Sequence, residues 1–131
     1  MKTVLIVEDN PINWRVFEKI ITKRGAMLAK HTEDVEEVLH MASSGEADII
    51  LMDICLANSY YQGKPVNGVE ITRLLKANEQ TAKLPVILVT ALGESDREQL
   101  LAQSGADGFI AKPVVDYQNF VDQIKAKLPQ E

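Results

Sequence analysis

Five side chains suited to metal or phosphoryl chemistry each follow a short apolar run in this 131-residue chain. They are the carboxylates of Glu8, Asp9 and Asp53, the hydroxyl of Thr90 and the ammonium of Lys112. If the runs end at one place, three carboxylates repel each other unless a cation joins them, and hard oxygen ligands favour Mg²⁺. An ammonium and a hydroxyl directed at the same point suit a phosphoryl group. A carboxylate beside the metal could then act as a nucleophile and form an acyl phosphate.

The apolar runs are short and rich in branched side chains, which predicts buried strands. The segments between them carry apolar residues at helical spacing, with Asn10 and Pro11 as a predicted helix start, Thr32 as a second helix cap and Gly25 as a stop. Strands are predicted over 3–7, 26–30, 48–52, 84–89 and 107–111, and helices over 11–24, 33–44, 68–77, 94–103 and 117–128.

Strands that alternate with helices predict an α/β fold, in which a parallel sheet is covered on both faces. Right-handed crossovers make this a doubly wound sheet. In such sheets ligands bind beyond the carboxyl ends of the strands. The five reactive side chains are therefore expected to converge at that edge.

Composition excludes several classes of function. The net charge is −5, with 14 basic and 19 acidic residues and no basic cluster, which is unfavourable for binding nucleic acid or an anionic membrane. No apolar run approaches the ~20 residues of a membrane span. The apolar start is too short for a signal peptide, and Cys55 is the single cysteine. We expect one soluble, cytoplasmic domain.

Four motifs lie in register on this alternation: V-L-I-V-E-D-N-P at 4–11, I-I-L-M-D-I at 49–54, V-I-L-V-T-A at 86–91 and I-A-K-P at 110–113. Together they resemble the receiver domain of two-component response regulators, the CheY-like fold, over essentially the whole chain. The resemblance implies five strand–helix units with the strand order 2-1-3-4-5. It also implies that Asp53 is the phosphoacceptor and that Glu8 and Asp9 hold Mg²⁺.

Further roles follow from the same resemblance. The backbone carbonyl of Cys55 is expected to be another metal ligand. Thr90 and Lys112 are expected to contact phosphoryl oxygens, and Phe109 takes the place of the switch aromatic. The bond between Lys112 and Pro113 is expected to be cis. Cys55 and Leu92 are expected to flank the water path that influences the lifetime of the phosphoaspartate.

The implied function is that of a stand-alone receiver, one domain over 1–131 with no output domain. It would accept a phosphoryl group from a sensor histidine kinase or a histidine phosphotransfer protein. It would signal through a downstream protein target or pass the phosphoryl group on. Such a protein is not an enzyme in its own right, although it assists its own phosphorylation and dephosphorylation. It is expected to be a monomer or a weak homodimer, without nucleic acid or membrane partners.

The segment 54–67 departs from the family pattern. The family usually has Pro four residues after the phosphoacceptor, where this chain has Ala57. The family Gly eight residues after it matches Gly68, fifteen residues on, so this connection carries an insertion of about seven residues. Either the insertion bulges into solvent, or it gates the site or selects a kinase. Tyr60 and Tyr61 favour a contact role.

Several alternatives remain open from the sequence. Trp14 either packs against a neighbouring loop or anchors a kinase. His31 and His40 are predicted to be ordinary surface or helix residues. A degenerate receiver that acts without phosphorylation would normally lack one of the acids or Lys112. A flavodoxin-like carrier needs a phosphate loop after the first strand, where acids stand here, and a haloacid-dehalogenase-like phosphatase needs an acid at position 55.

Overall fold

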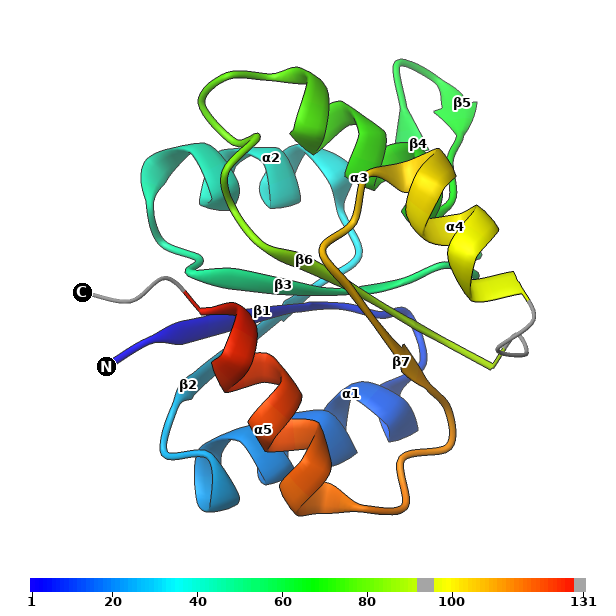
Figure 1. Ribbon diagram of the computed structural model, residues 1–131. Coiled ribbons are helices and arrows are strands. Elements are labelled where there is room, and N and C mark those ends of the chain that lie inside the picture. The colour runs from blue at the N-terminus through cyan, green and yellow to red at the C-terminus, as the bar shows by residue number, and fades with distance from the viewer. Residues whose placement is uncertain (92–95, 129–131) are drawn as a thin grey trace.

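The sheet has five parallel strands in the order β2-β1-β3-β6-β7, which is the predicted order 2-1-3-4-5 of the main strands (Figure 1). The computed structural model describes residues 1–91 and 96–128. The strands of this sheet are β1 (Thr3–Val7), β2 (Leu28–Thr32), β3 (Ile49–Asp53), β6 (Val86–Thr90) and β7 (Gly108–Ala111). The helices are α1 (Pro11–Lys19), α2 (Val35–Ser44), α3 (Gly68–Ala77), α4 (Arg97–Ser104) and α5 (Tyr117–Lys127).

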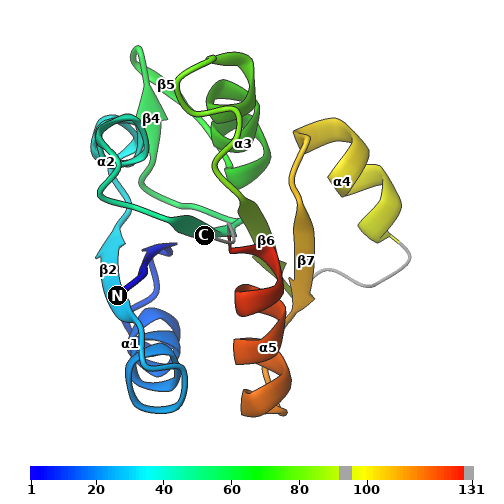
Figure 2. The ribbon, with the colours of Figure 1, turned by 60° about the vertical axis from the view of Figure 1, so that its left-hand side comes forward.

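Helices cover both faces of the sheet, as Figures 1 and 2 show. Alternate side chains of a strand point to opposite faces, so β1 contributes Leu5 to one apolar layer and Ile6 to the other. The layer that contains Leu5 packs against α2, α3 and α4, and the layer that contains Ile6 packs against α1 and α5. The central strands are buried on both faces, which explains their continuous apolar runs.

Helix α1 begins as the sequence predicts. The Asn10 side chain accepts hydrogen bonds from the backbone N–H groups of Ile12 and Asn13, at 2.9 and 3.3 Å, and Pro11 follows it at the first helical position. The helix does not run regularly to its stop, because residues Ile20–Arg24 form a π-helical turn that ends at Gly25.

The second strand begins two residues later than predicted, over 28–32 rather than 26–30. Thr32 therefore ends β2 and does not cap α2. Asp34 is the N-cap, and its carboxylate accepts a hydrogen bond from the backbone N–H of Glu36 at 3.1 Å. The later register places different side chains of β2 beside the end of β1.

The predicted helix over 94–103 corresponds to α4, and its expected start at Glu94 lies outside the described residues. Among the described residues, no helix is long and apolar enough to cross a membrane.

The long connection 54–67 contains a small antiparallel hairpin, β4 (Tyr60–Tyr61) and β5 (Lys64–Pro65). Gln62 and Gly63 link its strands, and both have positive φ, as a two-residue hairpin turn of type I′ requires. The chain then returns to the sheet at Gly68. A Cβ atom there would lie 2.0 Å from the carbonyl oxygen of Asp53, so only glycine fits this close approach.

Candidate functional site

The carboxyl ends of the central strands place the predicted side chains at one edge. Glu8 and Asp9 follow β1 directly, Asp53 is the last residue of β3, and Lys112 follows β7. Thr90 is the last residue of β6, and the residue before it, Val89, pairs with Asp53 of β3. The predicted convergence is therefore present, and it follows from parallel strands that all end at the same edge.

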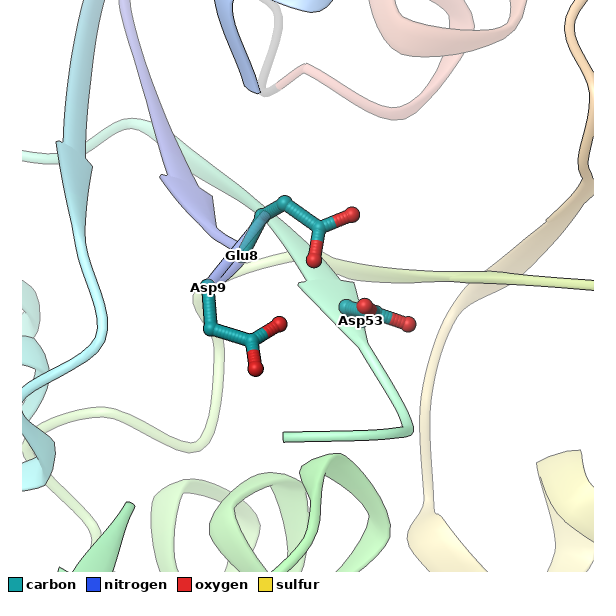
Figure 3. A group of neighbouring side chains, drawn as sticks. All are labelled: Glu8, Asp9 and Asp53. Atoms are coloured by element: carbon teal, nitrogen blue, oxygen red, sulfur yellow. The ribbon is translucent and has the colours of Figure 1, made fainter. Parts of the chain in front are cut away.

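Three carboxylates form the centre of this edge (Figure 3). One oxygen from each of Glu8, Asp9 and Asp53 lies within 4.8 Å of the others. Glu8 is 1% exposed, Asp53 is 6% exposed and Asp9 is half-buried. A compact set of hard oxygen ligands that leaves room for water fits Mg²⁺.

The Glu8 carboxylate is held on both oxygens. Its Oε1 accepts hydrogen bonds from Lys112 Nζ at 2.8 Å and from Asn13 Nδ2 at 3.1 Å. Its Oε2 accepts a longer one from the backbone N–H of Asn10 at 3.4 Å. The Glu8 main chain is also held, since its carbonyl oxygen lies 2.6 Å from Nε2 of His31.

Asp53 shares the same ammonium. Lys112 Nζ lies 3.2 Å from Asp53 Oδ2, and the backbone N–H of Cys55 donates to Oδ1 at 3.3 Å. Burial raises the pKa of Asp53, and the hydrogen bond and negative charge of Glu8 raise it further, to about 7, against the attraction of Lys112. Without a metal ion, the Asp53 carboxyl is thus partly protonated near neutral pH.

The pKa values of the two neighbouring groups shift in the directions that favour their charged forms. Burial acts to raise the pKa of Glu8, but hydrogen bonds with Asp53 and Lys112 and the charge of Lys112 outweigh it and lower that pKa to about 2. Burial acts to lower the pKa of Lys112, but the hydrogen bond of Glu8 and the charges of both carboxylates raise it. Glu8 and Lys112 are consequently charged whenever Asp53 titrates.

The remaining predicted residues lie at or below this edge. Thr90 is buried, and the Cys55 side chain is exposed. Phe109 is 5% exposed in the layer beneath α4, with the Arg97 guanidinium 5.9 Å from its ring centre. The bond between Lys112 and Pro113 is cis, as expected. Leu92 lies outside the described residues.

Sequence reasoning missed the groups that hold the acids. The Trp14 ring stacks on His31 of β2, with centroids 4.2 Å apart and planes 12° apart. His31 is therefore not an ordinary surface residue. Of the groups that contact the acids, Asn13 could have been found from the sequence, because it lies one helical turn after Asn10, the N-cap of α1. The backbone N–H of Ala57 donates to Asp9 Oδ2 at 3.0 Å. Every residue except proline has such a group, so the residue type does not indicate this contact.

Known proteins share this architecture. The receiver domain of the sensor histidine kinase PA1611 from Pseudomonas aeruginosa PAO1, with a magnesium ion coordinated in its active-site cleft, is 28% identical, with a TM-score of 0.74 over 95% of this chain and 98% of that one. The chemotaxis protein CheY4 of Vibrio cholerae is 20% identical, with a TM-score of 0.80 over 98% of this chain and 99% of that one, and shows the same fold.

The sequence comparisons agree. The polar-differentiation response regulator DivK of Brucella ovis is 35% identical over 127 residues, which is 97% of this chain and 96% of DivK. The family model of the response regulator receiver domain matches residues 4–125. The chain therefore belongs to the response regulator receiver family, which serves two-component signalling together with histidine kinases or phosphotransfer proteins.

Proposed function

We propose that Asp53 accepts a phosphoryl group from the phosphohistidine of a sensor histidine kinase or a histidine phosphotransfer protein, with Mg²⁺ bound beside it. One observation carries the proposal: a buried carboxyl shares one ammonium with a second carboxylate, inside a group of three acids at the carboxyl edge of the sheet. Buried titratable groups with shifted pKa values in such a place are candidates for chemistry.

The transfer is a displacement at phosphorus. An ionised Asp53 oxygen attacks, the bond between phosphorus and the histidine nitrogen breaks, and the imidazole keeps the electron pair and takes up a proton. Bound Mg²⁺ supplies charge neutralisation at the phosphoryl oxygens. Lys112 is expected to exchange its contact with Asp53 for one with the transferred group. Thr90, at the end of β6, is expected to donate to another phosphoryl oxygen.

The residues present fit these roles. Glu8 and Asp9, with the backbone carbonyl of Cys55, are the proposed metal ligands beside Asp53. Phe109 is the proposed switch aromatic, because it lies in the layer beneath α4 and its strand ends beside the site. The chain retains every acid and the lysine that a receiver needs, which disfavours a receiver that works without phosphorylation.

We further propose that the chain works as a single cytoplasmic receiver. Its output would be a phosphorylation-dependent contact with a protein target or onward phosphotransfer, from a monomer or a weak homodimer. The acidic net charge of −5 supports a protein partner over nucleic acid. The chain would assist its own phosphorylation and dephosphorylation at Asp53, but it would not be an enzyme that acts on other substrates.

Phosphorylation by acetyl phosphate tests the proposal. Intact mass should show one added phosphoryl group on the wild type with Mg²⁺, and none with a chelator. Asp53→Asn should add none. Asp122→Asn, which changes an exposed carboxylate on α5, is the matched control and should react like the wild type. Stoichiometric phosphorylation of Asp53→Asn would refute the assignment.

A further inference from the structure

The inserted segment reaches the acidic edge through one backbone group. We infer that the N–H of Ala57 positions Asp9 as a metal ligand and that the inserted hairpin supports this N–H. The inference rests on the proposed function, because it assumes that Asp9 holds Mg²⁺. It concerns a residue outside the motifs that mark the family.

The contact itself selects one oxygen of Asp9. The Ala57 N–H donates to Asp9 Oδ2 at 3.0 Å across 48 residues of sequence, which leaves Oδ1 available to a cation. Asp9 is half-buried and follows the end of β1, whereas Glu8 beside it is held by Lys112 and Asn13. Outer donors of this kind orient ligands and are important for metal affinity.

The residue type at position 57 permits this contact. The family pattern has proline here, and proline carries no N–H. Alanine in this chain therefore supplies a donor that the usual residue cannot supply. Position 57 departs from the family pattern, and the insertion follows it. Together they place a backbone N–H where it donates a hydrogen bond to Asp9, an acid of the proposed metal site.

The insertion holds the donor in place. Two residues after Ala57, the Ser59 hydroxyl, 2% exposed, donates to the carbonyl oxygen of Glu33 at 2.7 Å. The Ser59 carbonyl in turn accepts from the N–H of Val66 at 3.0 Å, which closes the base of the hairpin. Tyr61 and Val66 pack against the apolar layer of α2, α3 and α4. The segment is therefore tied to the connection between β2 and α2, not free in solvent.

Magnesium affinity of two Ala57 variants tests the inference. Ala57→Pro removes the donor, and Ala57→Ser keeps it with a similar side-chain size. We expect Ala57→Pro to weaken Mg²⁺ binding on the order of tenfold, a typical loss for an outer-shell partner, and Ala57→Ser to bind like the wild type. Calorimetric titration measures the affinity, and the single tryptophan, Trp14, reports it in parallel because it stacks on His31, which contacts Glu8.

A further variant separates positioning from general stability. Ser59→Ala keeps the donor but loses its support, so its Mg²⁺ affinity should fall between those of Ala57→Pro and the wild type. Thermal unfolding in chelator identifies a variant that is merely unfolded. If Ala57→Pro does not fold, amide hydrogen exchange of the wild type decides. Protection of the Ala57 amide that Asp9→Asn lowers supports the contact, and exchange as fast as in an open chain overturns it.

The outcomes distinguish this inference from the function beneath it. A folded Ala57→Pro that binds Mg²⁺ with wild-type affinity overturns the inference alone. A wild type that binds no Mg²⁺ overturns the proposed metal site and the inference together. Equal losses in Ala57→Pro and Ala57→Ser also overturn it, because the serine variant retains the N–H.

Discussion

The carboxyls of Glu8 and Asp53 lie in one crevice with a single ammonium, and their pKa values move apart to about 2 and about 7. Lys112 contacts both, but it lies closer to Glu8, at 2.8 Å against 3.2 Å. Glu8 therefore keeps its charge, and the proton of the pair belongs to Asp53. A proposed nucleophile that is protonated near neutral pH needs a metal ion or a higher pH to become ionised.

The pH dependence of the free energy of unfolding should reveal the proton on Asp53. Since the folded pKa of Asp53 is raised from 3.8 to about 7, the folded state binds more protons than the unfolded state between these values. The free energy of unfolding therefore loses this contribution as pH rises through that window. In chelator, we expect Asp53→Asn to stabilise the protein more at pH 8 than at pH 5, by on the order of 1–3 kcal/mol. Denaturant unfolding at both pH values measures it, and equal effects would contradict the assigned proton.

Asn13 should matter once Lys112 turns to a phosphoryl group. Its Nδ2 would then be the remaining side-chain donor to Glu8 Oε1 among those described. We expect Asn13→Ala to lower Mg²⁺ affinity and the acetyl phosphate rate on the order of tenfold or more, because a hydrogen bond to a charged group contributes about 1.5–3 kcal/mol. Asn119→Ala on the exposed start of α5 is the control. Unchanged affinity and rate in Asn13→Ala would exclude this role.

Residue types predicted the acids but not their supports. Glu8, Asp9, Asp53 and Lys112 were predictable because each lies at the end of a short apolar run, and parallel strands end at one edge. His31 was misjudged because its contact depends on the register of β2, which starts two residues later than its pattern indicates. The Ala57 contact is made by backbone, so its existence depends on the path of a loop.

Among the helices and strands, too, some features were predictable from the sequence and others were not. The bounds of β1 and α3 were predicted to the residue, because a buried branched run and apolar residues at helical spacing are strong local signals. The π-helical turn after α1 and the hairpin in 54–67 were not predicted. Both depend on φ values and on packing against neighbouring elements, and two-residue strands are too short to show a period.

Gly68 tests how closely α3 must approach β3. A methyl group there would meet the Asp53 carbonyl oxygen at 2.0 Å and its carbonyl carbon at 2.8 Å, so the strand end that carries the phosphoacceptor must shift. We expect Gly68→Ala to cost roughly 1–3 kcal/mol of unfolding free energy, as overpacked sites do, and to slow phosphorylation. Urea unfolding and acetyl phosphate labelling measure both.

Gly45→Ala is the matched control for that substitution. Gly45 ends α2 with φ of 85°, and nothing lies within 4 Å of an added methyl group. The variant should lose about 1–2 kcal/mol through backbone strain while it is phosphorylated normally. If both variants keep full phosphorylation, the close approach at Gly68 serves stability alone.

At the scale of the molecule, the sheet connects the acidic edge to two separate apolar layers. β3 lies at the centre of the sheet and ends in Asp53, while β6 and β7 end in Thr90 and beside Lys112. β7 also carries Phe109 into the layer beneath α4. A charge change at the edge is therefore adjacent to strands that run through the sheet between the two apolar layers.

Magnesium should stabilise the whole fold, and pH should set by how much. A ligand that binds only the folded state adds RT ln(1 + [L]/Kd) to the free energy of unfolding, which is about 2.7 kcal/mol at a ligand concentration of 100 Kd. Since Asp53 keeps its proton below about pH 7, Mg²⁺ must displace that proton at pH 6 but not at pH 8. We therefore expect tighter binding and a larger rise in Tm at pH 8 than at pH 6, with proton release at pH 6 detectable by calorimetry in two buffers. In Asp53→Asn the pH dependence should largely vanish, because Glu8 remains ionised throughout this range. A pH-independent rise in Tm for the wild type would show that Asp53 is not the group that exchanges its proton for the metal.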